Sequence, residues 1–174
     1  MKIIDLSMTI SDGMEVYPGD PEVKIEQVHF LKTHGWNLSK INMGSHTGTH
    51  VDAFSHMTNR DFSSIDEIPV EKFMGEAMLL SPKDEFPAGI NLLFFEEIDI
   101  NLLDKIVKSK PNFVGGDISV DLERALLEKG IITYTNLINL DKLPRNKKFF
   151  FIGLPLKIKG GDGSSVRAVA ILDK

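Results

Sequence analysis

Short apolar runs of strand length, separated by turn residues, are the feature that most constrains how this chain can fold. A run of four to eight apolar residues bounded by turn residues is typical of a buried or half-buried strand. Tyr17 to Pro21 is one such turn between apolar runs, because its prolines fix φ and Gly19 tolerates a positive φ. The sequence therefore predicts strands at residues 3–6, 23–31, 38–43, 77–80, 92–95, 113–115, 131–134, 149–154 and 166–172. Imperfect alternation over residues 23–28 indicates that the second of these strands is half-buried.

Helical periodicity is confined mainly to the second half of the chain. Residues 99–108 place Ile100, Leu103 and Ile106 on one face, and Pro111 follows. Residues 121–129 predict a second helix with Asp121 as N-cap and Gly130 after its end. Residues 70–74 could form one short turn. Many strands with few helices predict an α/β fold, a single mixed domain over residues 1–174.

Composition excludes several classes of protein. The chain contains no cysteine, which rules out disulfide frameworks, thiolate nucleophiles and cysteine-based metal sites. No apolar run approaches the roughly 18 residues that a membrane-spanning helix needs, and the first residues lack the apolar core of a signal peptide. A formal net charge of −5 disfavours nucleic acid as a partner. We therefore expect a cytoplasmic protein with no membrane and no nucleic-acid partner.

Three of the five histidines lie within one stretch of eleven residues, His46 to His56, which also contains His50 and Asp52. Imidazole nitrogens and carboxylate oxygens are ligands that suit zinc, manganese, iron or cobalt. Single histidines are more often surface or hydrogen-bonded residues, but three beside an aspartate in a chain otherwise poor in histidine favour a metal site. Two neutral histidines and one aspartate commonly leave a coordination position open for water.

The backbone around these residues is expected to be extended and then bent. Thr47, Gly48 and Thr49 are poor helix formers, so a strand is favoured over a helical HxxxH arrangement. A strand would project His46, His50, Asp52 and His56 from one face but would spread them over roughly 33 Å. The chain must therefore bend, most easily at Gly48. The hydroxyls of Thr47 and Thr49 could orient ligands, or could simply belong to strand residues.

The stretch His46-Thr-Gly-Thr-His50-Val-Asp52 through His56 resembles the HxGTHxDxPxH signature of the cyclase-like metal-dependent hydrolases. That family includes bacterial kynurenine formamidase and isatin hydrolase. Phe54 stands where the signature usually has proline. The resemblance extends in family order over nearly the whole chain, through the segments 5–7, 17–20, 116–117, 119–121, 154–156 and 167–168.

The resemblance implies roles for individual residues. His46, His50 and Asp52 would ligate the first metal, and His56 would transfer a proton without ligating it. Tyr17 stands where formamidases commonly have a tryptophan that packs on an aromatic substrate. The resemblance also implies a compact swivelling β/β/α-like fold, a homodimer or homotetramer, and a small-molecule substrate. The implied reaction is hydrolysis of an amide, lactam or formamide bond, as by an arylformamidase.

Two positions depart from the members of the family that hold two metals. By this alignment Glu123 occupies the position of a histidine ligand, and Thr135 occupies that of a glutamate ligand. Glu123 could still ligate a metal, or could be an acid that the helix dipole favours in the first turn. Threonine is a poor substitute for a carboxylate. The expected cofactor is one or two divalent ions per chain, zinc or manganese, and one is favoured.

Other hypotheses stay open. The two-histidine, one-carboxylate set also suits a non-haem iron oxygenase, although nothing in the sequence marks a cosubstrate site. The departures at Glu123 and Thr135 suggest a small-molecule or metal-binding protein that has lost catalysis. The glycine-rich residues 160–165 predict a hairpin turn before the last strand and need no further role. Trp36 could lie in the core, or could reach a partner's active site.

Overall fold

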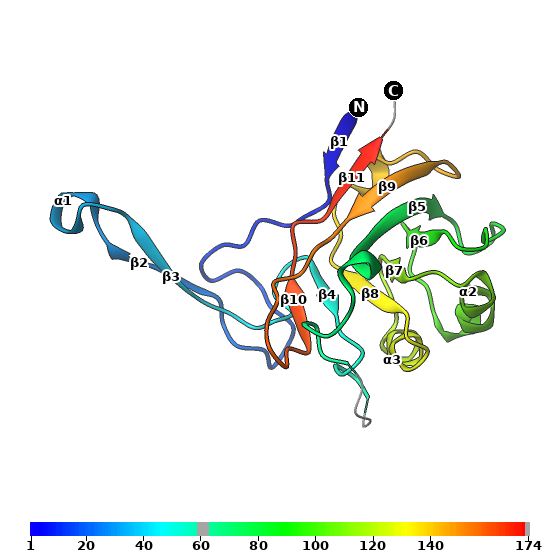
Figure 1. Cartoon of the computed structure of the whole chain (residues 1–174), viewed down its shortest axis with the longest axis horizontal. Coiled ribbons are helices and arrows are strands. Elements are labelled where there is room, and N and C mark those ends of the chain that lie inside the picture. The colour runs from blue at the N-terminus through cyan, green and yellow to red at the C-terminus, as the bar shows by residue number, and fades with distance from the viewer. Residues whose placement is uncertain (59–62, 173–174) are drawn as a thin grey trace.

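A computed structural model describes residues 1–58 and 63–172, and its main body is a curled mixed sheet with helices on one face (Figure 1). The large sheet contains the strands β1 (Lys2–Asp5), β4 (His50–Asp52), β5 (Met74–Leu80), β6 (Asn91–Phe94), β7 (Phe113–Gly115), β8 (Ile132–Thr135), β9 (Lys148–Ile152), β10 (Gly163–Ser165) and β11 (Val169–Leu172). A separate hairpin contains β2 (Lys24–His29) and β3 (Leu38–Asn42), and the α-helices are α1 (Leu31–His34), α2 (Leu103–Ser109) and α3 (Val120–Glu128).

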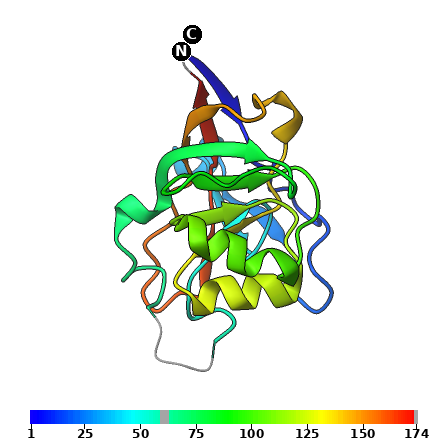
Figure 2. The same ribbon diagram turned by 90° about the vertical axis from the view of Figure 1, so that its right-hand side faces the viewer.

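The sheet has the order β1-β11-β9-β5-β6-β7-β8-β4-β10. The four central strands, β5 to β8, run parallel, and every pairing outside them is antiparallel. Helices α2 and α3 lie side by side against these central strands (Figure 2). The α/β class predicted from the sequence is therefore confirmed. In the described part of the chain, no helix is both long and apolar enough to span a membrane.

Two apolar cores lie on opposite faces of the parallel strands. Leu92 and Phe94 of β6 pack with Ile106 of α2 and Leu122 of α3. The intervening Leu93 belongs to the other core, inside the curl of the sheet, with Tyr134, Phe151 and other residues of β8, β9 and β11. This alternation follows from the two-residue period of a strand. Burial on both faces explains why these strands appear in the sequence as nearly continuous apolar runs.

Several predicted boundaries differ from the structure. Helix α3 begins at Val120. Its N-cap is Ser119 rather than Asp121, because Ser119 is the last residue with extended backbone angles (φ −63°, ψ 146°) before the helix. Asp121 instead lies in the first turn, where the helix dipole favours an acid. The helix predicted at 99–108 starts as a 3₁₀ turn at Ile100–Leu102 and continues as α2. The last strand begins at Val169.

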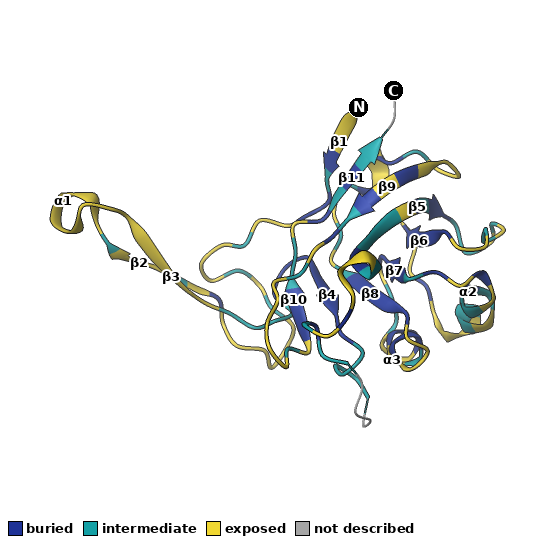
Figure 3. Ribbon diagram, in the orientation of Figure 1, coloured by how far each residue is buried: buried dark blue, intermediate teal, exposed yellow. Residues whose placement is uncertain are grey.

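Two further expectations about the strands are corrected. Residues 160–165 are not only a turn, because β10 pairs with β4 at the edge of the sheet. The strand predicted at 23–31 is not half-buried: β2 ends at His29, and α1 follows. The hairpin of β2 and β3 projects from the main body, and Figure 3 shows it almost wholly exposed. Its alternating residues therefore do not mark a core face within one chain.

Candidate metal centre

The clustered histidines lie in a turn and the short strand that follows it. His46 precedes β4, and Gly48 has the positive φ (+64°) of a bend. His50 and Asp52 belong to β4, and His56 lies in the next turn. The bend expected at Gly48 is therefore confirmed. It brings His46 back over β4, so that residues ten positions apart in sequence gather at one place.

Strand register supplies the surroundings of His50 and Asp52. In the antiparallel pair of β4 and β8, His50 lies opposite Thr135, and Asp52 lies opposite Thr133. Residues opposite each other share one face of a sheet, so both hydroxyls reach the β4 side chains. On the other side of β4, Gly163 of β10 lies opposite Asp52. A Cβ at Gly163 would lie 2.5 Å from His46 Cε1, so glycine there makes room for the His46 ring.

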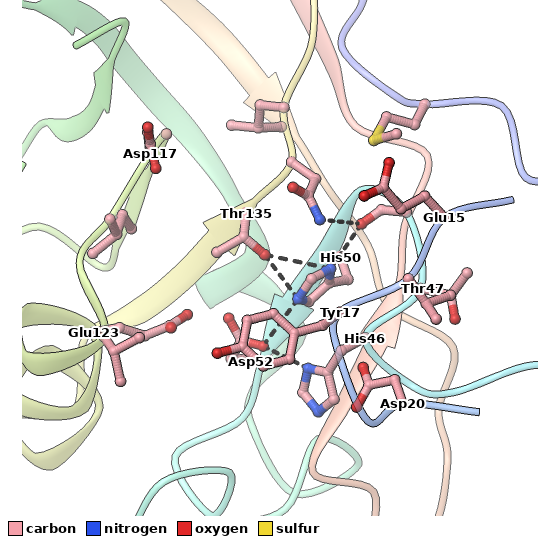
Figure 4. Close-up of a pocket in the computed structure, with 18 of the residues that line it drawn as sticks. Glu15, Tyr17, Asp20, His46, Thr47, His50, Asp52, Asp117, Glu123 and Thr135 are labelled. Atoms are coloured by element: carbon pink, nitrogen blue, oxygen red, sulfur yellow. Dashed lines mark hydrogen bonds and ion pairs between the residues drawn. The ribbon is translucent and has the colours of Figure 1, made fainter. Parts of the chain in front are cut away.

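Three donor atoms converge at the base of this cluster. Asp52 Oδ1 lies 2.8 Å from His46 Nδ1 and 3.5 Å from His50 Nε2. Figure 4 shows the three side chains turned toward one another, with Thr135 reaching His50 from the neighbouring strand. Donors in the first shell of one zinc ion, with bonds of about 2.1 Å, lie at separations of this order. The three residues implied as ligands by the resemblance are therefore brought together.

Each of these donor groups is held on its other side. His50 Nδ1 donates to Gly48 O at 2.7 Å, which leaves Nε2 as the nitrogen facing Asp52. Thr133 donates to Asp52 Oδ2 at 2.8 Å, which leaves Oδ1 as the inner oxygen. His46 Nε2 lies 3.1 Å from Asp162 Oδ2. Outer partners of this kind fix tautomer and orientation in protein metal sites, so this donor set fits a divalent ion.

The electrostatics of the cluster also fit a cation. Burial lowers the pKa of His46, but the carboxylates of Asp52 and Asp162 outweigh this and raise it to about 9. Burial opposes ionisation of Asp52, whose side chain is 1% exposed, yet the hydrogen bond from His46 and the charge of His50 hold its pKa below the usual value. The site thus favours the ionised form of a buried carboxylate, whose charge a cation would balance.

His56 lies beside the donor set rather than in it. Its ring centroid is 3.9 Å from that of His46, and its Nδ1 is 3.6 Å from Asp162 Oδ2. Burial and the charge of His46 lower the pKa of His56 below its ordinary value. His46, His56 and Asp162 form a second group of donors. Because Asp52 is buried and Asp162 is half exposed, the first group has the greater need of a cation.

The cluster lies in a pocket of about 1030 Å³. His56, Met57, Phe94, Phe95 and Leu137 also line it, so polar donors meet apolar walls. Tyr17 lies at the pocket with 72% of its surface exposed, a position from which its ring could cover a planar ligand. The substrate role expected of Tyr17 stays a prediction.

Glu123 and Thr135 both lie next to the donor set, Glu123 near Asp52 and Thr135 near His50. Glu123 projects from α3, is buried, and lies 3.3 Å from Thr133 Oγ1, the hydroxyl that also contacts Asp52. Burial and the charge of Asp52 raise the pKa of Glu123. Thr135 Oγ1 lies 2.7 Å from His50 Nε2. Glu123 is absent from the two donor groups found among the described residues, so its role as a ligand stays a prediction.

The sequence does not identify Asp162 as part of this cluster, and it leaves the position of Trp36 open. Asp162 was interpreted as part of a hairpin turn, yet its carboxylate contacts His46 and Ser45. The pairing of β10 with β4 brings Asp162 to the site, and no local pattern in the sequence predicts that pairing. Trp36 is 57% exposed and packs edge-on against His29, so the interpretation that placed it in the core is wrong.

Comparisons with known proteins agree with this arrangement. The family model "Putative cyclase" matches residues 4–132. An uncharacterised protein of Methanocaldococcus jannaschii is 34% identical over 99% of this chain and 100% of its own length. Kynurenine formamidase of Salinibacter ruber is 30% identical over 97% of both chains.

Solved structures share the fold. A crystal structure of an isatin hydrolase bound to the product analogue thioisatinate superposes with a TM-score of 0.85 at 18% identity, covering 99% of this chain and 93% of the other. A predicted metal-dependent hydrolase from Bacillus stearothermophilus has a TM-score of 0.75 at 22% identity, covering 97% of both chains. On the match of the family model and the two sequence relatives, this chain belongs to the cyclase family.

Proposed function

We propose that this chain is a metal-dependent hydrolase that cleaves an amide, lactam or formamide bond of a small molecule. The observation that carries the proposal is the convergence of His46 Nδ1, His50 Nε2 and Asp52 Oδ1 in a large pocket. The other polar atom of each side chain makes a contact that fixes its orientation. The kynurenine formamidase relative and the isatin hydrolase structure support a carbon–nitrogen bond as the target. The absence of cysteine is consistent with the cytoplasmic location that we also propose.

The proposed cofactor is one zinc or manganese ion on His46, His50 and Asp52. A divalent ion supplies Lewis acidity, which lets water act as a nucleophile near neutral pH and polarises a carbonyl. Asp52 contributes the full negative charge among these donors, and Thr133 holds its outer oxygen. A second ion would need Glu123 with a further donor, because Thr135 offers only a hydroxyl.

His56 is the proposed proton-transfer residue. Its Nδ1 faces Asp162, so Nε2 is the nitrogen available to accept a proton from the attacking water. The same nitrogen can then return the proton to the leaving nitrogen of the amide, which would otherwise depart as an unstable anion. Met57, Phe94 and Leu137 offer apolar surface in the same pocket, against which a planar substrate could pack.

Removal and return of the metal test this function. Protein purified without chelator or nickel affinity is expected to carry about one equivalent of zinc or manganese per chain by mass spectrometry. It should hydrolyse formanilide, an aryl formamide, or isatin, a lactam. Dialysis against a chelator should abolish turnover, and added zinc or manganese should restore it.

Three results would overturn this proposal. Turnover that survives complete loss of metal would contradict a metal-dependent reaction. Tight binding of amides or lactams without turnover, in fully loaded protein, would support the binding-protein alternative instead. Oxygen consumption that depends on Fe(II) would support the oxygenase alternative.

The hairpin of β2 and β3 supports a second proposal, that the enzyme is a homodimer. An isolated two-stranded hairpin is marginally stable in water and needs another surface to pack against. Six large apolar side chains of this hairpin are between 38% and 62% exposed: Val28, Phe30, Leu31, Trp36, Leu38 and Ile41. A second copy of the chain would bury them, and a homotetramer would arise if two such dimers pair.

Light scattering of the protein as it elutes from a size-exclusion column should give a molar mass about twice that of one chain. Leu31→Ser combined with Trp36→Ser should shift the protein toward monomer at low micromolar concentration. Val70→Ser, a change at a residue that is 59% exposed outside the hairpin, is the matched control and should leave the mass unchanged. A monomeric wild-type protein at tens of micromolar would contradict the dimer.

A further inference from the structure

Asp162 connects the proposed ligand His46 with the proposed proton-transfer residue His56. Its Oδ2 lies 3.1 Å from His46 Nε2 and 3.6 Å from His56 Nδ1. We propose that Asp162 is a positioning residue, which holds His46 in the orientation that binds metal and keeps His56 beside it. This inference rests on the proposed function, but its main test is independent of turnover.

The carboxylate is held in place by the loop around it. Ser45 Oγ donates to Asp162 Oδ1 at 2.8 Å, so one oxygen is fixed and the other faces the two histidines. The backbone is anchored as well, because Ala53 N donates to Asp162 O at 2.8 Å and Ile65 N donates to Gly161 O at 2.8 Å. These bonds join the loop to Ala53, the residue after Asp52, and to Ile65. Asp162 is therefore positioned by the same framework as the residues that it contacts.

The contact with His46 determines which nitrogen is presented to a metal. An imidazole that donates Nε2–H to a carboxylate has its lone pair on Nδ1, and Nδ1 is the atom 2.8 Å from Asp52 Oδ1. Gly48 O performs the same task for His50 by accepting from Nδ1. Each proposed histidine ligand thus has one outer acceptor, and Asp162 is the acceptor that belongs to His46.

The contact with His56 is longer. At 3.6 Å it is too long for a well-formed hydrogen bond, and it becomes an ion pair only when His56 is protonated. A shift of the ring by less than about 1 Å would form the bond, and the proton that His56 gains at Nε2 during turnover would strengthen the attraction. Asp162 would then hold the His56 ring beside His46, with Nε2 directed away from Asp162.

The first experiment measures zinc affinity by competition with a chromophoric chelator. Loss of an outer partner typically weakens metal binding by about 10- to 100-fold, and we expect this range for Asp162→Ala. Asp162→Asn keeps an oxygen that can accept from His46 Nε2, so it should recover most of the affinity. Asp104→Asn removes an exposed carboxylate from α2 and is the matched control, with unchanged affinity.

The second experiment reads the His46 ring directly. Long-range ¹H–¹⁵N spectra of the zinc-loaded protein should show His46 protonated at Nε2, with that proton exchanging faster in Asp162→Ala than in the wild type. Turnover should fall through kcat with KM little changed, because Asp162 contacts the histidines and not the substrate. If Asp162→Ala does not fold, Ser45→Ala releases the carboxylate instead and should give the same changes in smaller measure.

Two results would overturn the inference whether or not the protein is a hydrolase. Unchanged zinc affinity together with an unchanged His46 signal in Asp162→Ala would show that the carboxylate positions nothing. Complete loss of zinc in both Asp162→Ala and His56→Ala, with zinc retained by Asp52→Ala, would show instead that the ion binds to His46, His56 and Asp162. Failure of the proposed function would appear separately, as loaded wild-type protein that does not turn over any amide or lactam.

Discussion

Asp52→Ala is expected to remove the metal and the hydrolytic activity together. The Asp52 carboxylate is 1% exposed and lies between His46 and His50, so it supplies the buried negative charge that a divalent ion needs. A metal contributes several kcal/mol of transition-state stabilisation, and each 1.4 kcal/mol is a tenfold change, so kcat/KM should fall by about 10³-fold or more. Metal content by mass spectrometry and turnover of formanilide or isatin, measured on the same preparation, test this expectation.

Glu123→Ala is the matched control, because it also truncates a buried carboxylate near Thr133. If one ion binds to His46, His50 and Asp52, Glu123→Ala should retain about one equivalent of metal. Loss of metal from both variants would instead identify Glu123 as a ligand. Retention of metal by Asp52→Ala would contradict the assignment of the site. Circular dichroism of each variant separates loss of metal from loss of fold.

Local sequence patterns predicted the parts of the fold that local physics determines. Apolar runs such as those of β6 and β7 are buried on both faces, and their burial requires an unbroken run of apolar residues. The bend at Gly48 also followed from local reasoning, because four same-parity residues on a straight strand cannot reach one ion. Helix α3 was predicted within one residue at each end, because its apolar spacing and following glycine are both local signals.

The neighbours of the site were beyond such reasoning because they depend on pairing between distant strands. Asp162 lies 110 positions after Asp52, and only the register of β10 on β4 brings them together. The alignment of Thr135 with a ligand position came from the family resemblance, whereas its contact with His50 came from the register of β8 on β4. The exposure of the β2–β3 hairpin was not predicted, because a local pattern was misleading there. Its alternation is typical of a half-buried strand, but within one chain the hairpin packs against no core.

The second large effect is expected at His56. His56→Ala should keep the metal and lose turnover, because the ring lies beside His46 but is not one of the three convergent donors. General acid–base catalysis contributes about 10²- to 10⁴-fold, so kcat should fall within that range while metal content stays at the wild-type value. Single-turnover measurements with formanilide or isatin on fully loaded protein provide the test.

His46→Ala is the matched control, which separates loss of proton transfer from loss of the metal. The two rings are 3.9 Å apart and both contact Asp162, so truncating either one disturbs nearly the same volume. His46→Ala should lose metal and turnover together, whereas His56→Ala should lose turnover alone. If His56→Ala also released the metal, His56 would be a ligand, and another group would have to move the proton. If it kept both metal and full turnover, the proton transfer assigned to His56 would be wrong, although the metal site would still stand.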